Sequence, residues 1–336
     1  MAYKIDIKVN NILHEKCSIV LDDHQKLTDL CGFNDSNLKI IESLLGSSVY
    51  TTGNELHFSS DNKEKQAHFK KIITKLEEYC AKGCSLSPDL INGIYSGITF
   101  KESLIKNSEL NNENSVEDLE IIIPGSSKRV FPKSYNQVSL IKKFSSFDII
   151  FVVGPAGTGK TYLAVAKALS EILQKKKRKF ILTRPVVEAG ESLGFLPGDL
   201  TQKINPYLRP LYDAMESLIP FETIAKLEES RIIEIAPLAY MRGRSLSDSF
   251  IILDEAQNTT KEQMKMFLTR IAEGSKAVIT GDITQMDIPN KKQSGLIHAI
   301  NILKDVKEIG FCFLSSEDVM RNSLIKKIIE AYDKEK

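Results

Sequence analysis

Long hydrophobic runs are missing from this sequence. No stretch of the 336 residues approaches the roughly 18 consecutive apolar residues that a membrane-spanning helix needs. The opening segment, "MAYKIDIKVN", alternates polar and apolar side chains and lacks the apolar core of a signal peptide. We therefore expect a cytoplasmic protein that makes no contact with a membrane.

An excess of charge of either sign is also missing. Lys and Arg together number 45 and Asp and Glu number 44, which gives a net charge of +1. A surface that binds nucleic acid therefore has to arise from a local cluster of basic residues. One such cluster is "QKKKRKF" (174–180). It is either a solvated loop, the interpretation that we favour, or a nucleic-acid contact.

Cysteine is scarce, and arginine is absent from the first 128 residues. The five cysteines form an odd, scattered set, which fits a reducing compartment better than a disulfide framework. All nine arginines lie at Arg129 or beyond it, although lysine occurs throughout the chain. Because the guanidinium group binds phosphate or carboxylate through two parallel hydrogen bonds, we expect such sites in the later part of the chain.

The hydrophobic pattern of the first part predicts a small α+β domain over residues 1–84. The expected elements are short strands in residues 1–22, helices in residues 37–46 and 62–82, and a hairpin in residues 48–60 that turns at Gly53 and Asn54. A polar segment rich in Asn, Ser and Glu follows at residues 107–118. It indicates a linker over residues 85–125.

From residue 126 onward the sequence predicts an α/β domain that extends to residue 336. Short apolar runs alternate there with helical segments, which is typical of a parallel sheet buried on both faces. The runs occupy residues 148–153, 180–183, 249–253, 277–281 and 309–314.

A glycine-rich segment follows the first of these runs. "GPAGTGKT" (154–161) fits the pattern G-x-x-x-x-G-K-[ST] between an expected strand and an expected helix, the context that a phosphate-binding loop requires. The residues expected to surround the phosphates are Gly154, Pro155, Ala156, Gly157, Thr158, Gly159, Lys160 and Thr161. Lys160 would reach the β- and γ-phosphates, and Thr161 would bind Mg²⁺.

Polar residues also follow two later runs. Asp254 and Glu255 stand after "SFIIL" (249–253), where a parallel sheet presents its ligand crevice. Asp254 would hold Mg²⁺, and Glu255 would act as the base that activates the attacking water. Gln285 is a candidate contact for the γ-phosphate, and Gln137 is a candidate contact for the adenine edge. We therefore predict hydrolysis of a nucleoside triphosphate.

Five segments, in this order along the chain, resemble the PhoH family of P-loop ATPases over about residues 125–336. They are "GPAGTGKTYLAVAKAL" (154–169), residues 182–215, "IIEIAPLAYMRGRSL" (232–246), "FIILDEAQNTTKEQMKMFLTR" (250–270) and "TGDITQMDIPNKKQSGL" (280–296). The resemblance implies a RecA-like core related to the first core domain of superfamily 1 helicases. It also implies ATP and Mg²⁺ as cofactors and an action on RNA.

The resemblance carries roles to individual residues. It gives Walker A roles to Lys160 and Thr161, Walker B roles to Asp254 and Glu255, the motif III role to Gln285 and the adenine-reading role to Gln137. Arg184 lies where related helicases hold a nucleic-acid backbone. The family pattern has a His where this chain has Asn322, beside Arg321, so no role is carried over to that position.

The first domain resembles the KH-like unit that precedes the ATPase in this family. Its loop "GFND" (32–35) lacks the second glycine of the GXXG loop with which KH modules clamp RNA. Two interpretations stay open for this domain, namely RNA binding and packing within an oligomer.

The resemblance also implies an oligomer. Superfamily 1 helicases complete the ATP site with arginines from a second RecA-like domain, for which this chain has no room. A neighbouring subunit would then supply the arginine, and identical subunits arranged head to tail close into a ring, by the resemblance a hexamer. The first candidates are Arg242 and Arg244, followed by Arg270 and Arg321. The alternative for each is a solvated or paired surface charge.

Two functions from different classes fit these observations. The first is an ATPase, stimulated by RNA, that moves along or remodels single-stranded RNA in a helicase-like manner during RNA processing. The alternative is a nucleotide-switched protein that binds an RNA-processing enzyme or a ribosome-associated factor and does not unwind RNA.

Overall fold

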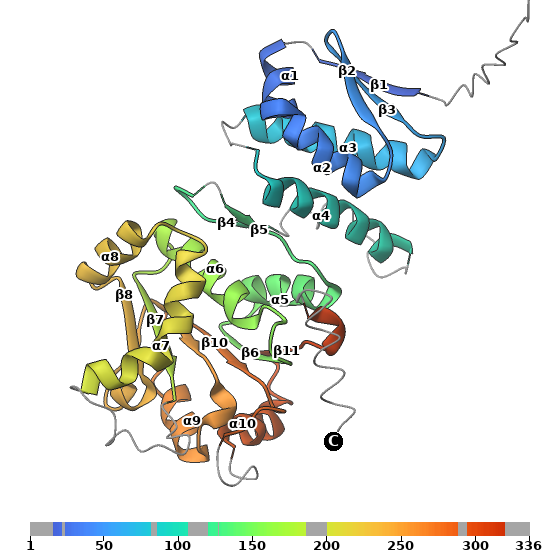
Figure 1. The fold of residues 1–336 in the computed structure, drawn as a ribbon. Coiled ribbons are helices and arrows are strands. Elements are labelled where there is room, and N and C mark those ends of the chain that lie inside the picture. The colour runs from blue at the N-terminus through green and yellow to red at the C-terminus, as the bar shows by residue number, and fades with distance from the viewer. Residues whose placement is uncertain are drawn as a thin grey trace, which may run out of the picture. The chain divides into compact units, whose positions relative to one another are not determined.

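Figure 1 shows the computed structural model of the chain. The structure describes residues 16–21, 24–81, 86–106, 120–126, 128–185, 200–287 and 294–319. The chain divides into two units, Met1–Asn111 and Asn112–Lys336. In the described part, no helix has both the length and the apolar character needed to cross a membrane. The candidate Arg321 and the position Asn322 lie outside the described residues.

The first unit contains an antiparallel sheet in the order β1-β3-β2 (Figure 1). Its strands are β1 (Lys16–Val20), β2 (Val49–Thr52) and β3 (Glu55–Ser59). β2 and β3 form the expected hairpin, and Gly53 in its turn has a φ of +60°, which glycine adopts without strain. Leu56 and Phe58 on β3 are fully buried. The first unit therefore has a core of its own.

Helices pack with this sheet to form the first unit. They are α1 (His24–Cys31), α2 (Ser36–Leu45), α3 (Lys63–Ala81) and α4 (Pro88–Lys106). The helices expected in residues 37–46 and 62–82 are α2 and α3. Helix α1 was not predicted, because it is mostly polar, although its Leu27 and Leu30 are buried.

Helix α4 corrects the interpretation of residues 85–125 as a linker. It contacts α2 and α3, and its residues Leu90, Ile91 and Ile94 are buried. The linker was inferred from the polar residues 107–118, which lie outside the described part of the chain. The apolar residues ahead of that segment form a helix because they bury one face against the first unit.

The second unit contains a six-stranded parallel sheet in the order β11-β6-β10-β9-β7-β8. Its strands are β6 (Ile149–Val153), β7 (Lys179–Arg184), β8 (Ile233–Pro237), β9 (Ser249–Leu253), β10 (Lys276–Gly281) and β11 (Ile309–Phe313). This sheet confirms the predicted α/β fold class. Five strands coincide with the predicted apolar runs, whereas β8 was missed because it lies at the sheet edge and carries the half-buried Glu234.

A short hairpin, β4 (Ile121–Ile122) and β5 (Arg129–Val130), belongs to this unit. The Ser170 hydroxyl of helix α6 donates a 2.6 Å hydrogen bond to the carbonyl oxygen of Ile122. Residues at the end of the predicted linker are therefore packed against the second core.

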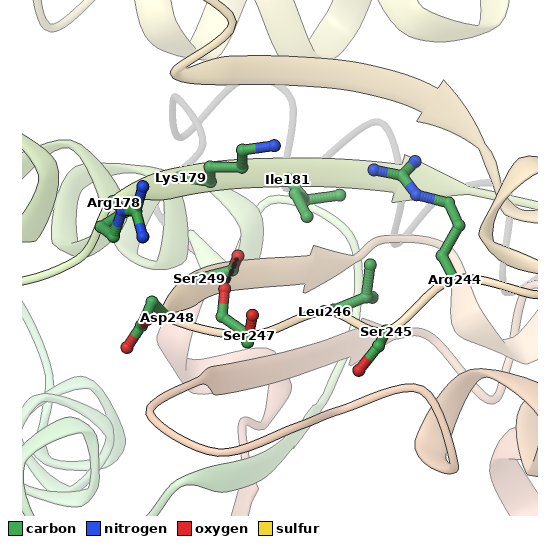
Figure 2. Close-up of a pocket in the computed structure, with 9 residues that line it drawn as sticks. All are labelled: Arg178, Lys179, Ile181, Arg244, Ser245, Leu246, Ser247, Asp248 and Ser249. Carbon is green, nitrogen blue, oxygen red and sulfur yellow. Dashed lines mark hydrogen bonds between the residues drawn. The ribbon is translucent and has the colours of Figure 1, made fainter.

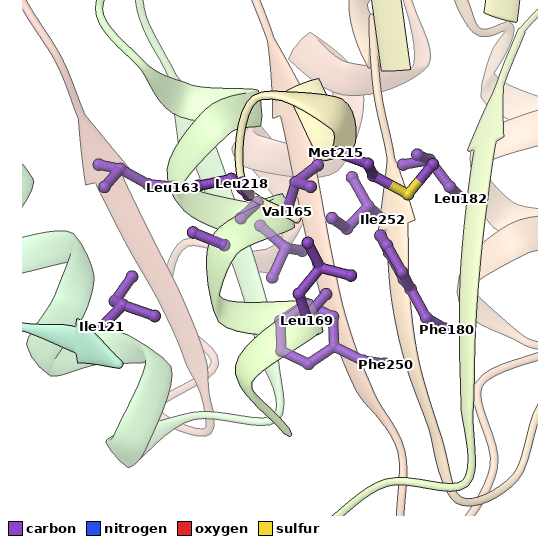
Figure 3. Packing of buried hydrophobic residues seen from close by; sticks show 14 of the residues in the cluster. Ile121, Leu163, Val165, Leu169, Phe180, Leu182, Met215, Leu218, Phe250 and Ile252 are labelled. Carbon is purple, nitrogen blue, oxygen red and sulfur yellow. The ribbon is translucent and has the colours of Figure 1, made fainter. Parts of the chain in front are cut away.

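Helices cover both faces of the parallel sheet (Figure 1). One face carries α5 (Tyr135–Ser146), α6 (Lys160–Leu173), α7 (Leu200–Glu216) and α8 (Phe221–Glu229), and the other carries α9 (Lys261–Leu268) and α10 (Gly295–Leu303). Figure 3 shows Val165 and Leu169 of α6 packed among Phe180, Phe250 and Ile252 of the strands. Because α6 begins at Lys160, this packing fixes the phosphate loop against the sheet.

We expect the change Leu169→Ala to lower the free energy of unfolding by about 2–5 kcal/mol, because it leaves a cavity where the side chain is fully buried. Urea unfolding of the full chain, followed by circular dichroism, measures this loss. The control is Ile302→Ala, since that side chain is 61% exposed. Equal losses for the two variants would contradict the packing of α6.

Candidate active site

The loop between β6 and α6 is held in a conformation that requires glycine. Gly157 and Gly159 have φ values of +81° and +79°, in the left-handed region. A Cβ atom on Gly154 would lie 2.7 Å from the Cβ atom of Leu314, so no side chain fits there either. The loop leads directly into the N-terminus of α6, and such a junction favours a bound phosphate.

Lys160, the first residue of α6, bends back over this loop. Its Nζ donates hydrogen bonds of 2.6 and 2.8 Å to the carbonyl oxygens of Gly154 and Pro155. Burial lowers the pKa of Lys160 below its ordinary value, and the nearby carboxylates of Asp282, Asp254 and Glu255 oppose this effect. Two of the three N–H donors of the ammonium group are thus used by backbone carbonyl oxygens, and a bound phosphate would compete with these oxygens for the group.

Thr161 and Asp254 meet across the sheet. The Thr161 hydroxyl donates a 2.8 Å hydrogen bond to Oδ1 of Asp254, and the Thr280 hydroxyl donates one of 2.6 Å to the same atom. Asp254 is 6% exposed. A hydroxyl and a carboxylate beside a phosphate loop are hard oxygen donors, and they fit Mg²⁺, which takes few protein ligands and keeps its remaining contacts for water and phosphate.

Glu255 has an unusual backbone and two side-chain partners. Its φ is +52°, which is rare for a residue with a side chain. Arg184, at the end of β7, lies 3.1 Å from Oε1, and Gln257 donates a 2.5 Å hydrogen bond to Oε2. Both carboxylate oxygens therefore have a partner in this structure, and a water molecule that binds there shares the carboxylate with Arg184 and Gln257.

The segment after β10 closes the other side of the site. Gln257 donates to the carbonyl oxygen of Gln285 at 3.0 Å and accepts from the backbone N–H of Asp282 at 2.9 Å. Asp282 in turn accepts a 3.1 Å hydrogen bond from the backbone N–H of Ala156 in the phosphate loop. These contacts tie the ends of β9 and β10 to the loop. A cavity of about 260 Å³ opens here, lined by Lys160, Glu255, Gln285 and their neighbours.

The structure thus brings together Lys160, Thr161, Asp254, Glu255 and Gln285 at one edge of the sheet. The bridging residues Gln257, Thr280 and Asp282 were not predicted from the sequence. Their position in the sequence could have identified them, because each lies at or just after the end of a strand, where a parallel sheet forms its ligand crevice.

Gln137 occupies a different place from these residues. It is 4% exposed, its Nε2 donates to the carbonyl oxygen of Thr158 at 3.0 Å, and its Oε1 accepts from the backbone N–H of Lys133 at 2.7 Å. The described lining of the cavity does not include it. In this structure Gln137 holds the phosphate loop through the carbonyl oxygen of Thr158 and does not line the cavity. Its contact with adenine stays a prediction.

The two candidate arginines after η4 (Leu238–Met241) differ in their surroundings. Arg244 forms a bidentate ion pair with Glu234 of β8, with N–O distances of 2.5 and 2.8 Å. Hydrogen bonding between the two raises the pKa of Arg244 and lowers that of Glu234. Arg242 is exposed, and its side chain has no partner among the described residues. Neither arginine lines the cavity at the phosphate loop.

The candidate Arg270 contacts the same segment. Its Nη1 donates to the carbonyl oxygen of Arg244 at 3.5 Å, and its Nε is buried without a partner among the described residues. Arg270 therefore supports the turn that carries Arg244. Its side chain is half-buried, whereas that of Arg242 is exposed.

Known proteins resemble this chain over most of its length. A family model described as PhoH-like protein matches residues 129–333, which include the phosphate loop and the Asp254–Glu255 pair. The PhoH-like protein of Mycobacterium tuberculosis is 45% identical over 304 residues, covering 90% of this chain and 84% of that protein. The PhoH-like protein of Bacillus subtilis is 44% identical over 316 residues, covering 94% of this chain and 96% of that protein.

Two solved helicase structures match more distantly. The Pif1 helicase from Candida albicans is 14% identical with a TM-score of 0.31, covering 58% of this chain and 43% of that chain. The Hef helicase domain of Pyrococcus furiosus is 16% identical with a TM-score of 0.34, covering 54% of this chain and 38% of that chain. This chain spans less than half of either structure.

Asp318 anchors the start of α5, the helix that carries Gln137. It is 3% exposed, and its Oδ2 accepts hydrogen bonds from Asn136 at 2.8 Å and from the backbone N–H of Ser315 at 2.6 Å. Burial by itself raises the pKa of Asp318, but hydrogen bonds from Ser134, Ser315 and Asn136 outweigh it, so the pKa lies below its ordinary value.

A carboxylate with a lowered pKa stabilises the fold above its unfolded pKa, near 3.9, and loses this contribution as the pH falls through its folded pKa. We therefore expect Asp318→Asn to cost about 1–3 kcal/mol of unfolding free energy at neutral pH, and this difference from wild type to shrink in acid. Urea unfolding at a series of pH values measures both. Asp305→Asn, at an exposed position, is the control. A difference that does not depend on pH would contradict the assignment.

Proposed function

This chain belongs to the PhoH family, and we propose that it hydrolyses ATP in the presence of Mg²⁺ and couples the hydrolysis to single-stranded RNA. The observation that carries the ATPase proposal is the meeting of Lys160, the Thr161–Asp254 pair and Glu255 around one cavity. These are the groups that bind phosphates, hold a metal ion and activate a water molecule in P-loop enzymes. The family assignment itself implies nucleotide binding.

Each of these residues has a distinct role in the proposal. Lys160 and the loop backbone bind the β- and γ-phosphates, and Thr161 and Asp254 hold Mg²⁺, which supplies charge neutralisation at the phosphates. Glu255 accepts a proton from the attacking water. Asp254 stays in place because two hydroxyls donate to it and the backbone N–H of Asp254 donates to the carbonyl oxygen of Thr183 at 2.9 Å.

The ion pair between Arg184 and Glu255 supports the coupling to RNA. Arg184 ends β7 at the carboxyl edge of the sheet, so its guanidinium group is within reach of a ligand that crosses this edge. A phosphate of RNA that binds Arg184 would compete with Glu255 for the same guanidinium group. Oε1 of Glu255 would then lose its guanidinium partner and accept a hydrogen bond from water more readily, and RNA binding would accelerate hydrolysis.

A second copy of the chain is expected to supply an arginine to the site. Arg244 already has two hydrogen bonds to Glu234 within its own subunit, so Arg242 is the better candidate. An arginine donated in this way stabilises the charge that develops on the phosphates. The head-to-tail contact that it requires closes into a ring of identical subunits, which we expect to be a hexamer in the cytoplasm.

We expect Glu255→Gln to lower the steady-state rate of ATP hydrolysis by about 10²- to 10⁴-fold, because it removes the general base. The affinity for ATP, measured by equilibrium titration, should remain. Glu273→Gln, at an exposed position away from the cavity lining, is the matched control. Retained turnover in Glu255→Gln would exclude Glu255 as the base.

For Arg184→Gln we expect a higher ATPase rate without RNA and little further stimulation by RNA. The change removes the partner that occupies Oε1 of Glu255. The measurement is the ATPase rate with and without an unlabelled oligouridylate, at low and moderate salt. Arg209→Gln is the matched control, since Arg209 pairs with Asp213 on the exposed side of α7.

A variant at Arg184 that keeps full stimulation by RNA would contradict the coupling. A wild-type rate that is slow and indifferent to RNA would instead favour the alternative in which the nucleotide state controls binding of a protein partner. The two outcomes can be told apart, because the first is measured on the Arg184 variant and the second on the unmodified chain.

We expect Arg242→Ala to lower ATPase activity by about 10³-fold or more without weakening ATP binding. Lys160→Ala should also be inactive, because it loses a phosphate contact. A mixture of the two variants should regain activity, since some subunit contacts then combine an intact Lys160 with an intact Arg242 from the neighbour. Activity that stays lost in mixtures, although the subunits exchange, would argue against a donated arginine.

A further inference from the structure

A second cavity lies in the ATPase unit, away from the phosphate loop. It has a volume of about 240 Å³ and is lined by residues from the start of β7 and from the segment that leads into β9. Figure 2 shows these residues, with Ile181 on the strand between Lys179 and Arg244. None of its lining residues lines the cavity at the phosphate loop. The two cavities are therefore separate and of similar size.

The second cavity is rich in positive charge. Arg178, Lys179 and Arg244 line it, and the side chains of Lys179 and Arg244 extend over Ile181 from opposite sides (Figure 2). Glu234 balances Arg244 through their bidentate ion pair. Arg178 and Lys179 are both exposed at this position.

The acidic residue in the lining faces elsewhere. Asp248 has its Oδ1 atom 2.3 Å from the position that a Cβ atom on Gly274 would take, so its carboxylate lies against the turn that contains Gly274. In Figure 2 this carboxylate points away from β7. Glu234 lies close enough to Lys179 to interact with its charge, so the net positive charge that a ligand would meet in the cavity comes first from Arg178 and then from Lys179.

The positive charge continues beyond the cavity along the chain. Lys175, Lys176 and Lys177 directly precede Arg178, and the first two are exposed. Lys177 donates to the carbonyl oxygen of Gly274 at 2.5 Å, which fixes the run beside the same turn. A single small anion needs only the cavity, whereas a charged strip of this length matches a polyanion.

We propose that this cavity binds a phosphate group in the backbone of single-stranded RNA, at a site separate from the ATP site. Arg178 and Lys179 contact the phosphate oxygens. The exposed lysines at 175 and 176 attract the neighbouring phosphates. The identity of the ligand rests on the proposed function, in which RNA stimulates the ATPase.

The cavity lies at the opposite end of β7 from Arg184. Five residue steps separate Lys179 from Arg184, or about 17 Å along an extended strand. An RNA strand that contacts both would therefore extend along the sheet, with one contact near the ATP site and one distant from it. The distant contact would contribute to affinity without any influence on the chemistry.

The test compares two double variants of the full chain. Arg178→Gln with Lys179→Gln alters the cavity, and Lys175→Gln with Lys176→Gln removes the same charge from the exposed run. The probe is a fluorescent oligouridylate of about 12 nucleotides, followed by anisotropy without ATP between about 50 and 200 mM salt. Circular dichroism confirms that each variant is folded.

We expect the cavity variant to bind the probe about tenfold more weakly, because charge-assisted hydrogen bonds to a phosphate are lost. The slope of log affinity against log salt should fall by about 0.7 for each lost phosphate contact. The control variant should lose less than the cavity variant. Equal losses in both variants, or none in the cavity variant, would overturn the site.

A free phosphate compound shares the same chemistry, so a second probe is inorganic phosphate in a thermal unfolding experiment. Stabilisation of wild type but not of the cavity variant, together with unchanged RNA affinity, would overturn RNA as the ligand. Basal ATPase activity without RNA should be equal in all three proteins. If wild type shows no ATPase activity, the proposed function fails, whereas this site is judged only by the binding of the RNA probe.

Discussion

A hydrogen bond of 2.8 Å from the Thr161 hydroxyl to Asp254 joins residues that are 93 positions apart in the sequence. It forms because β6 and β9 both pair with β10 in parallel register, so that the residues following β6 and β9 reach the same edge of the sheet. The rest of the site depends on this alignment. Asp282 at the end of β10 holds the phosphate loop through Ala156, and Gln257 joins Glu255 to the Asp282 backbone. The catalytic arrangement is therefore a consequence of sheet register, supported by close packing at Gly154.

Every reactive group of the site has an intramolecular partner. Lys160 contacts two carbonyl oxygens, Thr161 contacts Asp254, and Glu255 contacts both Arg184 and Gln257. Hydrogen bonds that involve a charged group contribute about 1.5–3 kcal/mol each, so a nucleotide has to replace several of them as it binds. Such an exchange keeps buried polar groups satisfied before and after binding. It also makes the state of Glu255 dependent on what else contacts Arg184, and this is the physical basis of the proposed coupling to RNA.

The sequence predicted those parts of the structure that depend on local pattern. Five strands of the parallel sheet contain short apolar runs, and the phosphate loop has glycines where φ is positive, so both were recognisable in advance. Edge strand β8 was missed because Glu234 interrupts its run, and α4 was missed because a neighbouring polar segment dominated the composition. Pairings such as Arg244 with Glu234 and Gln257 with Glu255 could not be predicted. They depend on which strands and turns lie side by side in the folded chain, and the hydrophobic periodicity of a single segment does not indicate that arrangement.

The central claim is that nucleotide binding exchanges these intramolecular contacts at the phosphate loop. The most direct measurement is a crystal structure of the chain with Mg²⁺ and a non-hydrolysable ATP analogue. We predict that the Lys160 ammonium leaves the carbonyl oxygens of Gly154 and Pro155 for the phosphates, and that the Thr161 hydroxyl turns from Asp254 to the metal ion. An analogue bound elsewhere, or bound at the loop with both sets of contacts unchanged, would contradict it.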